Sequence, residues 1–301
     1  MKLLFVRWGS STVSHIRRLA RIRRTLLGII LVISVCLLAE WLPQRSAMQV
    51  MVAEEQGIPL TVICYDQLMT DPVGDALPLQ LLEEDLRWLQ QQGFETVLPA
   101  QLRRFVDGMG ELPEKPVLLV MNGGYRTILT QVLPLLQEYG CRAVAAVAGS
   151  DADLYSGSVP RVEEEARLSW NEIRMLEKSG LFEIASQSYS LHTPSGSDGR
   201  KGLARLRGES TARYHQLLLE DLLTMQTRMN EELSHDASVF CYPFGEKNTE
   251  SQLVLEEMGF WMALSVGEGP VYLHENTDLL ELSMTERTAE PSAEFFDQWI
   301  S

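Results

Sequence analysis

The segment Val117–Met121 constrains the fold most, because it is a run of five apolar residues with no polar alternation. Such a run is typical of a strand that other elements cover on both faces, as in a parallel sheet. Asn122, Gly123 and Gly124 interrupt the run, and residues 126–139 then carry apolar side chains at helical spacing. A strand, a polar turn and a helix in this order predict an α/β fold, in which chemistry is placed at the carboxyl ends of the strands.

The rest of the chain repeats this pattern. After residue 58, segments with strand character and segments with helical character alternate about seven times. One helix is expected over residues 169–179, where Ser169 and Glu172 have the spacing of a capping box. The alternation favours a parallel sheet or a closed barrel, and a domain of about 250 residues suits a (β/α) barrel better.

The amino-terminal segment differs in composition from the rest. Five arginines between residues 17 and 24 precede Leu26–Ala39, a stretch of fourteen residues without a charge. We expect residues 25–42 to form a transmembrane anchor, with residues 1–24 in the cytoplasm because basic residues stay on that side. A linker over residues 43–57 and an outward-facing domain over residues 58–301 would follow. A cleaved signal peptide is the alternative, although no small-x-small cleavage site follows the apolar run.

The charge and the cysteines limit the partners. Residues 1–45 hold eight of the 26 basic residues and one of the 41 acidic residues, so the remainder is strongly acidic. Such a domain is not expected to bind nucleic acid, but it is compatible with a neutral polysaccharide or one with free amines. Solubility alone explains the acidic charge equally well. Cys64, Cys141 and Cys241 lack the close spacing of zinc ligands and are expected to be free thiols in or near the core.

Three motifs, in order along the chain, resemble one family. Residues 112–125 (LPEKPVLLVMNGGY) resemble LPxKPVLLTFDDGY, and residues 180–192 (GLFEIASQSYSLH) resemble GLxEIxSHTYxLH. Residues 241–248 (CYPFGEKN) resemble AYPYGEYN. These are motifs of the polysaccharide deacetylases of the NodB-homology type (carbohydrate esterase family four), in particular the membrane-anchored bacterial branch. The resemblance runs from about residue 58 to about residue 284 and implies a distorted parallel (β/α) barrel of about seven strands.

The resemblance implies a divalent metal, often zinc, held by one Asp and two His, with a second Asp as catalytic base. Here Asn122 stands at the position of the base, Gly123 at that of the metal-binding Asp, and Gln187 at that of the first His. Only His192 matches the second His. An amide does not accept a proton at neutral pH, and one imidazole is too few ligands for zinc. The arginine that the family places near the last strand is not found around Ser283.

Together with the expected anchor, these departures predict a bacterial plasma-membrane protein that has lost metal-dependent catalysis, has no cofactor and binds a cell-envelope glycan or acts as a scaffold. The glycan would be peptidoglycan or an N-acetylglucosamine polymer. Candidate site residues are Asn122, Asp66 and His192 at degenerate catalytic positions, and Gln187, Tyr189, Tyr242 and Pro243 for binding. The alternative is an active carbohydrate deacetylase, a hydrolase of N-acetyl C–N bonds, with a rebuilt site. It would use zinc, or it would use Asp66 and His192 as a metal-free acid–base pair.

Overall fold

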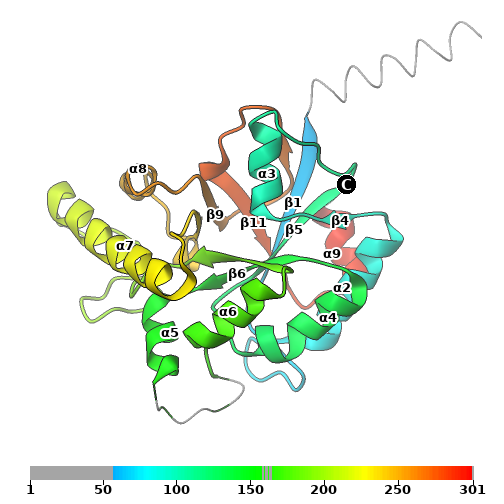
Figure 1. The fold of residues 1–301 in the computed structure, drawn as a ribbon, viewed down its shortest axis with the longest axis horizontal. Coiled ribbons are helices and arrows are strands. Elements are labelled where there is room, and N and C mark those ends of the chain that lie inside the picture. The colour runs from blue at the N-terminus through cyan, green and yellow to red at the C-terminus, as the bar shows by residue number, and fades with distance from the viewer. Residues whose placement is uncertain (1–56, 158, 160–161, 163–164, 300–301) are drawn as a thin grey trace, which may run out of the picture. The chain divides into compact units, whose positions relative to one another are not determined.

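The computed structural model describes residues 57–157, 159, 162 and 165–299, in which strands and helices alternate (Figure 1). The strands are β1 (Ile58–Tyr65), β2 (Leu68–Met69), β3 (Leu77–Pro78), β4 (Glu95–Thr96), β5 (Pro116–Met121), β6 (Ala143–Val147), β7 (Phe182–Ser186), β8 (Val239–Cys241), β9 (Met262–Val266), β10 (Val271–Leu273) and β11 (Leu282–Glu286). The α-helices are α2 (Leu79–Gln91), α3 (Pro99–Val106), α4 (Leu133–Tyr139), α5 (Gly149–Ser156), α6 (Trp170–Lys178), α7 (Thr211–Leu233), α8 (Thr249–Glu257) and α9 (Ser292–Trp299). Shorter helical turns are η1 (Ile128–Val132), η2 (Pro243–Gly245) and η3 (Leu279–Glu281).

Seven of these strands close into a barrel in which each neighbouring pair is parallel. Their order around the barrel is β1, β11, β9, β8, β7, β6 and β5, and β5 pairs with β1 through five residues of each strand. The ring is distorted, because β7 meets β8 at the single pair Ser186–Phe240. β4 extends the sheet beside β5, and β10 pairs antiparallel with the start of β1. The expected distorted parallel barrel of about seven strands is therefore confirmed in the described part of the chain.

Side chains alternate along each strand, so each barrel strand serves two cores. On β5, Leu119 packs outward with residues of the surrounding helices, including Leu86 of α2. Leu118 packs with Val62 and Val144 of the two neighbouring strands in the other cluster. The side chains from Val117 to Met121 on β5 are all buried. Burial on both faces explains why the sequence of β5 is apolar without alternation.

The amino end of the barrel is closed by α3. The backbone N–H of Ala100 donates a hydrogen bond to Glu183 of β7 (3.1 Å), and the Arg103 guanidinium lies over the ring of Trp261, just before β9. Leu102 and Val106 of α3 belong to the same apolar cluster as the inward-facing strand residues. The amino end is thus filled by a helix, which leaves the carboxyl ends of the strands as the place for a site.

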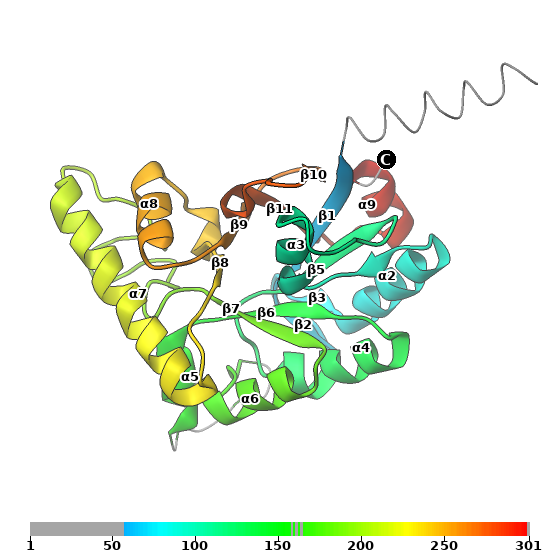
Figure 2. The ribbon, with the colours of Figure 1, turned by 45° about the horizontal axis from the view of Figure 1, so that its top comes forward.

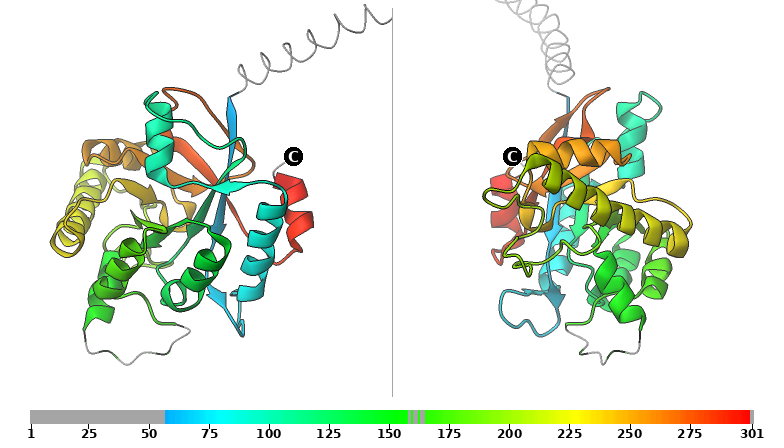
Figure 3. Two further views of the ribbon diagram at one scale, coloured as in Figure 1. Left: turned by 45° about the vertical axis from the view of Figure 1, so that its right-hand side comes forward. Right: turned by 90° about the vertical axis from the view of Figure 1, so that its left-hand side faces the viewer.

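The remaining helices surround the barrel (Figure 2). The longest, α7, runs beside α5, α6 and α8. The carboxyl-terminal helix α9 packs against α2 (Figure 3). The rings of Trp88 and Phe296 stack between these helices with centroids 4.4 Å apart. The described cysteines are free thiols: Cys64 and Cys241 are buried, and Cys141 is half-buried.

Two predictions about the elements need correction. The helix expected over residues 126–139 is divided into the π-helical turn η1 and the helix α4, because Pro134 has no N–H to donate within a continuous helix. The apolar pattern also predicts a last strand over residues 278–284. In the structure this strand begins at Leu282, because the Asp278 side chain accepts a hydrogen bond from the N–H of Leu280 and starts the turn η3.

The predicted membrane anchor lies outside the described residues, as does almost all of the predicted linker. Among the helices that the structure describes, none is both long enough and apolar enough to cross a bilayer.

Candidate functional site

The carboxyl ends of the barrel strands surround a cavity of about 540 Å³. Asp66 directly follows β1, and Asn122 directly follows β5. Both line the cavity, together with His192 from the segment after β7 and Tyr242 from the segment after β8. The structure therefore brings four of the seven candidate residues into one cavity, as parallel strands with a common polarity require.

Asn122 and Gln187 form a chain of hydrogen bonds across the floor of this site. Nε2 of Gln187 donates to Oδ1 of Asn122 (2.5 Å), and Oε1 of Gln187 accepts from the N–H of Gly123 (3.1 Å). Nδ2 of Asn122 in turn donates to Oδ1 of Asp66 (3.4 Å). Gln187 is 1% exposed, so each of its amide atoms needs a partner and each has one. Neutral amides therefore satisfy one another where the family resemblance implies a base and metal ligands.

Asp66 and His192 face the same cavity, but in the part of the chain that the structure describes no hydrogen bond joins them. Desolvation by surrounding protein atoms raises the pKa of the Asp66 carboxyl, although the Arg167 charge and the Asn122 hydrogen bond oppose this shift. Burial and, secondarily, the Arg167 charge lower the pKa of His192 to about 4. The imidazole is therefore neutral at pH 7, and without a direct contact the two groups do not form a ready acid–base pair.

Phe244 supplies an aromatic wall to the cavity. Its ring lies nearly parallel to the imidazole of His192, with centroids 5.2 Å apart and an angle of 9° between the planes. Its backbone has φ of 56°, a left-handed conformation that a bulky residue rarely adopts. Strained residues of this kind gather at ligand sites, and this conformation leaves the ring 36% exposed beside the cavity. The sequence signal for Phe244 was its place in the motif between Pro243 and Gly245.

Tyr242 and Pro243 hold the turn that presents Phe244. The N–H of Gly245 donates to the carbonyl of Tyr242 (3.1 Å), and the N–H of Glu246 donates to that of Pro243 (3.2 Å). Both side chains are buried. Of the two, Tyr242 also lines the cavity.

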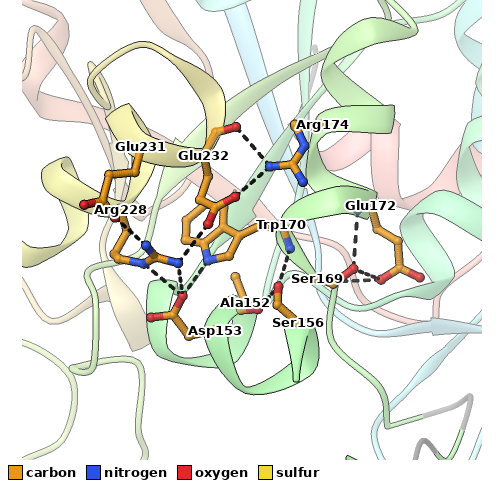
Figure 4. A network of polar contacts seen from close by, with 10 residues as sticks. All are labelled: Ala152, Asp153, Ser156, Ser169, Trp170, Glu172, Arg174, Arg228, Glu231 and Glu232. Atoms are coloured by element: carbon orange, nitrogen blue, oxygen red, sulfur yellow. Dashed lines mark hydrogen bonds and ion pairs between the residues drawn. The ribbon is translucent and has the colours of Figure 1, made fainter. Parts of the chain in front are cut away.

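Tyr189 lies away from the cavity, in a polar network between α5, α6 and α7. Its hydroxyl donates to Asp153 (2.9 Å), and its backbone N–H donates to Asp221 of α7 (2.8 Å). Asp153 also accepts from Nε1 of Trp170 (2.7 Å) and from Arg228 (2.7 Å), as Figure 4 shows. These contacts hold the loop after β7 against the helices. Tyr189 therefore helps to position the site without lining the cavity.

Arg167 also lines the cavity, although it was not among the predicted site residues. The segment around it pairs with the turn after β5: Tyr125 and Arg167 form an antiparallel bridge, and the N–H of Leu168 donates to the carbonyl of Gly124 (2.8 Å). The guanidinium lies 3.6 Å from the centre of the Tyr125 ring, and its Nη1 donates to the carbonyl of Gly123 (2.7 Å). No local sequence pattern marks this residue, since its position depends on pairing between segments about forty residues apart in the chain.

The site does not fit a divalent metal ion. Protein zinc sites use three or four ligands drawn from His, Cys, Asp and Glu. Across residues 57–157, 159, 162 and 165–299, no three such side chains are grouped so that they could hold one ion. Asn122 and Gln187 are engaged with each other, and Gly123 has no side chain.

An arginine does follow the last barrel strand, four residues beyond Ser283. Arg287 donates two hydrogen bonds to Asp85 of α2 (2.7 and 2.8 Å), and both side chains are fully buried. The hydroxyl of Tyr65 also donates to Asp85 (2.8 Å). The pair joins β11 to α2 in the core outside the barrel, and it is not part of the cavity.

Comparison with known proteins gives a consistent result. A family model described as polysaccharide deacetylase matches residues 109–263. A curated relative, the poly-beta-1,6-N-acetyl-D-glucosamine N-deacetylase of Escherichia coli strain K12, is 28% identical over 204 residues. The match spans 62% of this chain but only 30% of that relative.

Solved structures share the fold. A de-N-acetylase from Aggregatibacter actinomycetemcomitans superposes with a TM-score of 0.64 at 21% identity, covering 78% of this chain and 95% of the other. IcaB from Ammonifex degensii superposes with a TM-score of 0.61 at 23% identity, covering 79% and 94%.

Proposed function

The chain belongs to the polysaccharide deacetylase family, and from that premise we propose that it binds a cell-envelope glycan without hydrolysing it. The observation that carries this proposal is the hydrogen-bonded chain from Gln187 through Asn122 to Asp66. It stands at the strand ends where the family resemblance implies a general base and metal ligands. An amide cannot take a proton from water at neutral pH. Among the described residues, no group of ligands could hold the metal ion that would polarise the acetamide.

The cavity supports a carbohydrate as its ligand. Sugar rings bind proteins through an aromatic face and through hydrogen bonds to their hydroxyl groups. Phe244 offers such a face, and Asp66 offers an acceptor beside it. The Escherichia coli relative is named for poly-β-1,6-N-acetyl-D-glucosamine. An N-acetylglucosamine polymer, or peptidoglycan, which contains the same sugar, is therefore the ligand that we propose.

We also propose that the protein is anchored in a bacterial plasma membrane with residues 58–301 outside the cytoplasm. The support is the sequence pattern of five arginines followed by the uncharged stretch Leu26–Ala39. Protease treatment of intact spheroplasts tests this topology. We expect the added protease to digest the carboxyl-terminal domain. In a separate assay without protease, the intact chain should stay in the membrane after an alkaline wash. Protection of the domain from protease would contradict the proposed topology.

The binding function is tested with the purified full-length protein and β-1,6-linked N-acetylglucosamine oligosaccharides. Isothermal titration should show saturable binding, and a parallel assay should show no release of acetate above buffer. Phe244→Asn should weaken the binding, whereas Tyr272→Asn, at a half-exposed aromatic residue on β10 outside the cavity, should not. Acetate release that disappears in Asp66→Asn or His192→Asn would instead establish a deacetylase with a rebuilt site.

A further inference from the structure

The space beside Gly123 is already filled. A Cβ atom added to Gly123 would lie 2.8 Å from Cε2 of Tyr125 and 3.0 Å from Nη1 of Arg167. Both distances are shorter than ordinary contacts between carbon and its neighbours, so the two side chains occupy the place of a side chain at this position. According to the family resemblance, the missing side chain is the metal-binding carboxylate. The Tyr125 ring and the Arg167 guanidinium therefore occupy the space where the resemblance implies that carboxylate.

Arg167 is held in that place but is not saturated there. A guanidinium has five N–H donors. Within the described part of the chain, one hydrogen bond uses them, to the carbonyl of Gly123, and the nearest carboxylate oxygen, on Asp151, is 3.9 Å from Nε. The Tyr125 ring supports the guanidinium face at 3.6 Å. The side chain is 22% exposed and lines the cavity, so it presents donors to whatever the cavity contains.

The charge of Arg167 acts at the centre of the site. His192, the other basic residue among the described residues lining the cavity, is uncharged at pH 7. The same guanidinium lies close enough to oppose the raised pKa of Asp66. It therefore supplies a positive charge at the strand ends where a metal ion would otherwise supply one.

We propose that Arg167 is the fixed cation of this cavity and that it binds the carbonyl oxygen of an N-acetyl group. The inference rests on the proposed glycan-binding function and adds to it the acetylation state of the sugar. A guanidinium can donate hydrogen bonds to the same carbonyl oxygen that a metal ion would coordinate. Unlike the metal ion, it neither lowers the pKa of a bound water nor provides an open coordination position. The cavity can thus hold an acetylated sugar without cleaving it.

The carboxylates of the cavity favour an alternative hypothesis, in which the cavity prefers a de-N-acetylated sugar. Asp66, Asp151, Glu165 and Glu286 also line it, and they would attract the ammonium group of a de-N-acetylated sugar. Sugar hydroxyls, however, donate hydrogen bonds to carboxylates equally well, so these residues are compatible with a neutral sugar. The position of the Arg167 guanidinium, against the turn after β5, decides for the acetyl oxygen in our proposal.

The first experiment measures zinc and needs no glycan. The full-length triple variant Asn122→Asp/Gly123→Asp/Gln187→His restores the three family residues. We expect it to bind zinc weakly, because the new carboxylate at position 123 pairs with Arg167. Asp tolerates the left-handed backbone of Gly123 better than most residues. Adding Arg167→Gln should raise the zinc affinity at least tenfold. Equal affinities with and without Arg167→Gln would overturn the proposal, and circular dichroism verifies that both variants are folded.

The second experiment compares sugars. Titration of the native protein should favour β-1,6-linked N-acetylglucosamine trimer over the matched glucosamine trimer. Arg167→Gln should weaken binding of the acetylated trimer about tenfold or more, the loss typical of a hydrogen bond to a charged group, and Arg167→Lys should retain part of it. A preference for the free amine, or an unchanged affinity in Arg167→Gln, would overturn the proposal. Absence of binding to either trimer would count against the glycan-binding function itself, while the zinc measurements would still test the role of Arg167.

Discussion

Nε2 of Gln187 lies 2.5 Å from Oδ1 of Asn122, and this hydrogen bond joins the carboxyl end of β7 to that of β5. Both residues are amides, so the contact is neutral at every pH at which the protein is folded. The same positions in the family motifs hold an Asp and a His, which together with a metal ion perform the chemistry. The hydrogen bond therefore has a structural role at positions where the family resemblance implies catalytic residues.

Replacing Gln187 should reveal how strongly this contact supports the fold. Gln187→Met keeps the length of the side chain but leaves Oδ1 of Asn122 and the N–H of Gly123 without their partner. Unsatisfied buried groups cost roughly 1–3 kcal/mol each, so the free energy of unfolding should fall by about 2 kcal/mol or more. Urea denaturation measures this. Gln216→Met, which removes only a surface contact to Glu220, should change stability by less than about 0.5 kcal/mol. Similar effects in the two variants would contradict a structural role for Gln187.

His192 should make the protein less stable in mild acid. Its folded-state pKa of about 4 lies below the ordinary value of 6.5, so the unfolded chain binds the proton more tightly. Its contribution is present above pH 6.5 and is lost as the pH falls towards 4. Between pH 7 and pH 4.5 the free energy of unfolding of His192→Asn should therefore fall by about 2 kcal/mol less than that of the native protein.

His235 provides a control of opposite sign. Burial lowers its pKa, but hydrogen bonds with Asp236 and Glu177 outweigh burial and raise it overall. Its contribution is present below pH 6.5 and is lost as the pH rises through the folded-state pKa. His235→Asn should therefore steepen the loss of stability in acid. Parallel pH profiles for native protein and His192→Asn would show that His192 is not held neutral by its surroundings.

Phe244 should matter more for binding than for stability. Asn adopts left-handed backbone conformations far more readily than Phe, so Phe244→Asn relieves a strain of about 1 kcal/mol at φ of 56°. Because the residue is only 36% exposed, the apolar burial that Asn loses offsets this relief of strain. The melting temperature should therefore fall by less than for a fully buried Phe, while the affinity for oligosaccharide falls clearly. A clear drop in melting temperature together with unchanged affinity would show that the ring serves packing alone.

The buried pair Arg287–Asp85 should be important for stability and irrelevant to binding. Arg287→Met leaves the Asp85 carboxylate in the core with only the Tyr65 hydroxyl, and removing one partner of a buried pair costs about 3–5 kcal/mol. Breaking the exposed pair of Arg103 and Asp107 with Arg103→Met should cost less than about 1 kcal/mol. Denaturation curves of the two variants give the comparison, and equal losses would argue against a structural role for the buried pair.

The barrel was predictable because its strands carry strong local signals. β5 is apolar throughout since both faces are buried, and the capping box of Ser169 and Glu172 correctly marks the start of α6. The helix α5 was not expected: its eight residues include Gly149 and two aspartates, and only Gly149 and Ala152 are buried, so no apolar periodicity announces it. Its place is set instead by contacts such as that between Asp153 and Arg228.

The site was predictable in part for the same reason. Asp66 and Asn122 follow barrel strands directly, so topology alone brings them together. Arg167 reaches the cavity only through pairing of its segment with the turn at Tyr125, a long-range contact without a sequence period. Tyr189 follows a strand too, but the acceptors on Asp153 and Asp221 direct its polar groups towards the helices. Strand ends can be located from sequence, whereas the direction of a side chain beyond them depends on its partners in the fold.

The measurement that decides whether metal-dependent chemistry has been lost is the zinc content of the native full-length protein. It should be purified without chelator, dialysed against zinc and then against metal-free buffer, and analysed by plasma mass spectrometry beside the protein carrying His192→Ala. We predict far less than one zinc ion per chain in both samples, because Asn122, Gly123 and Gln187 provide no ligand set. One zinc ion per chain in the native protein, lost in His192→Ala, would contradict this and show that a metal site at His192 survives.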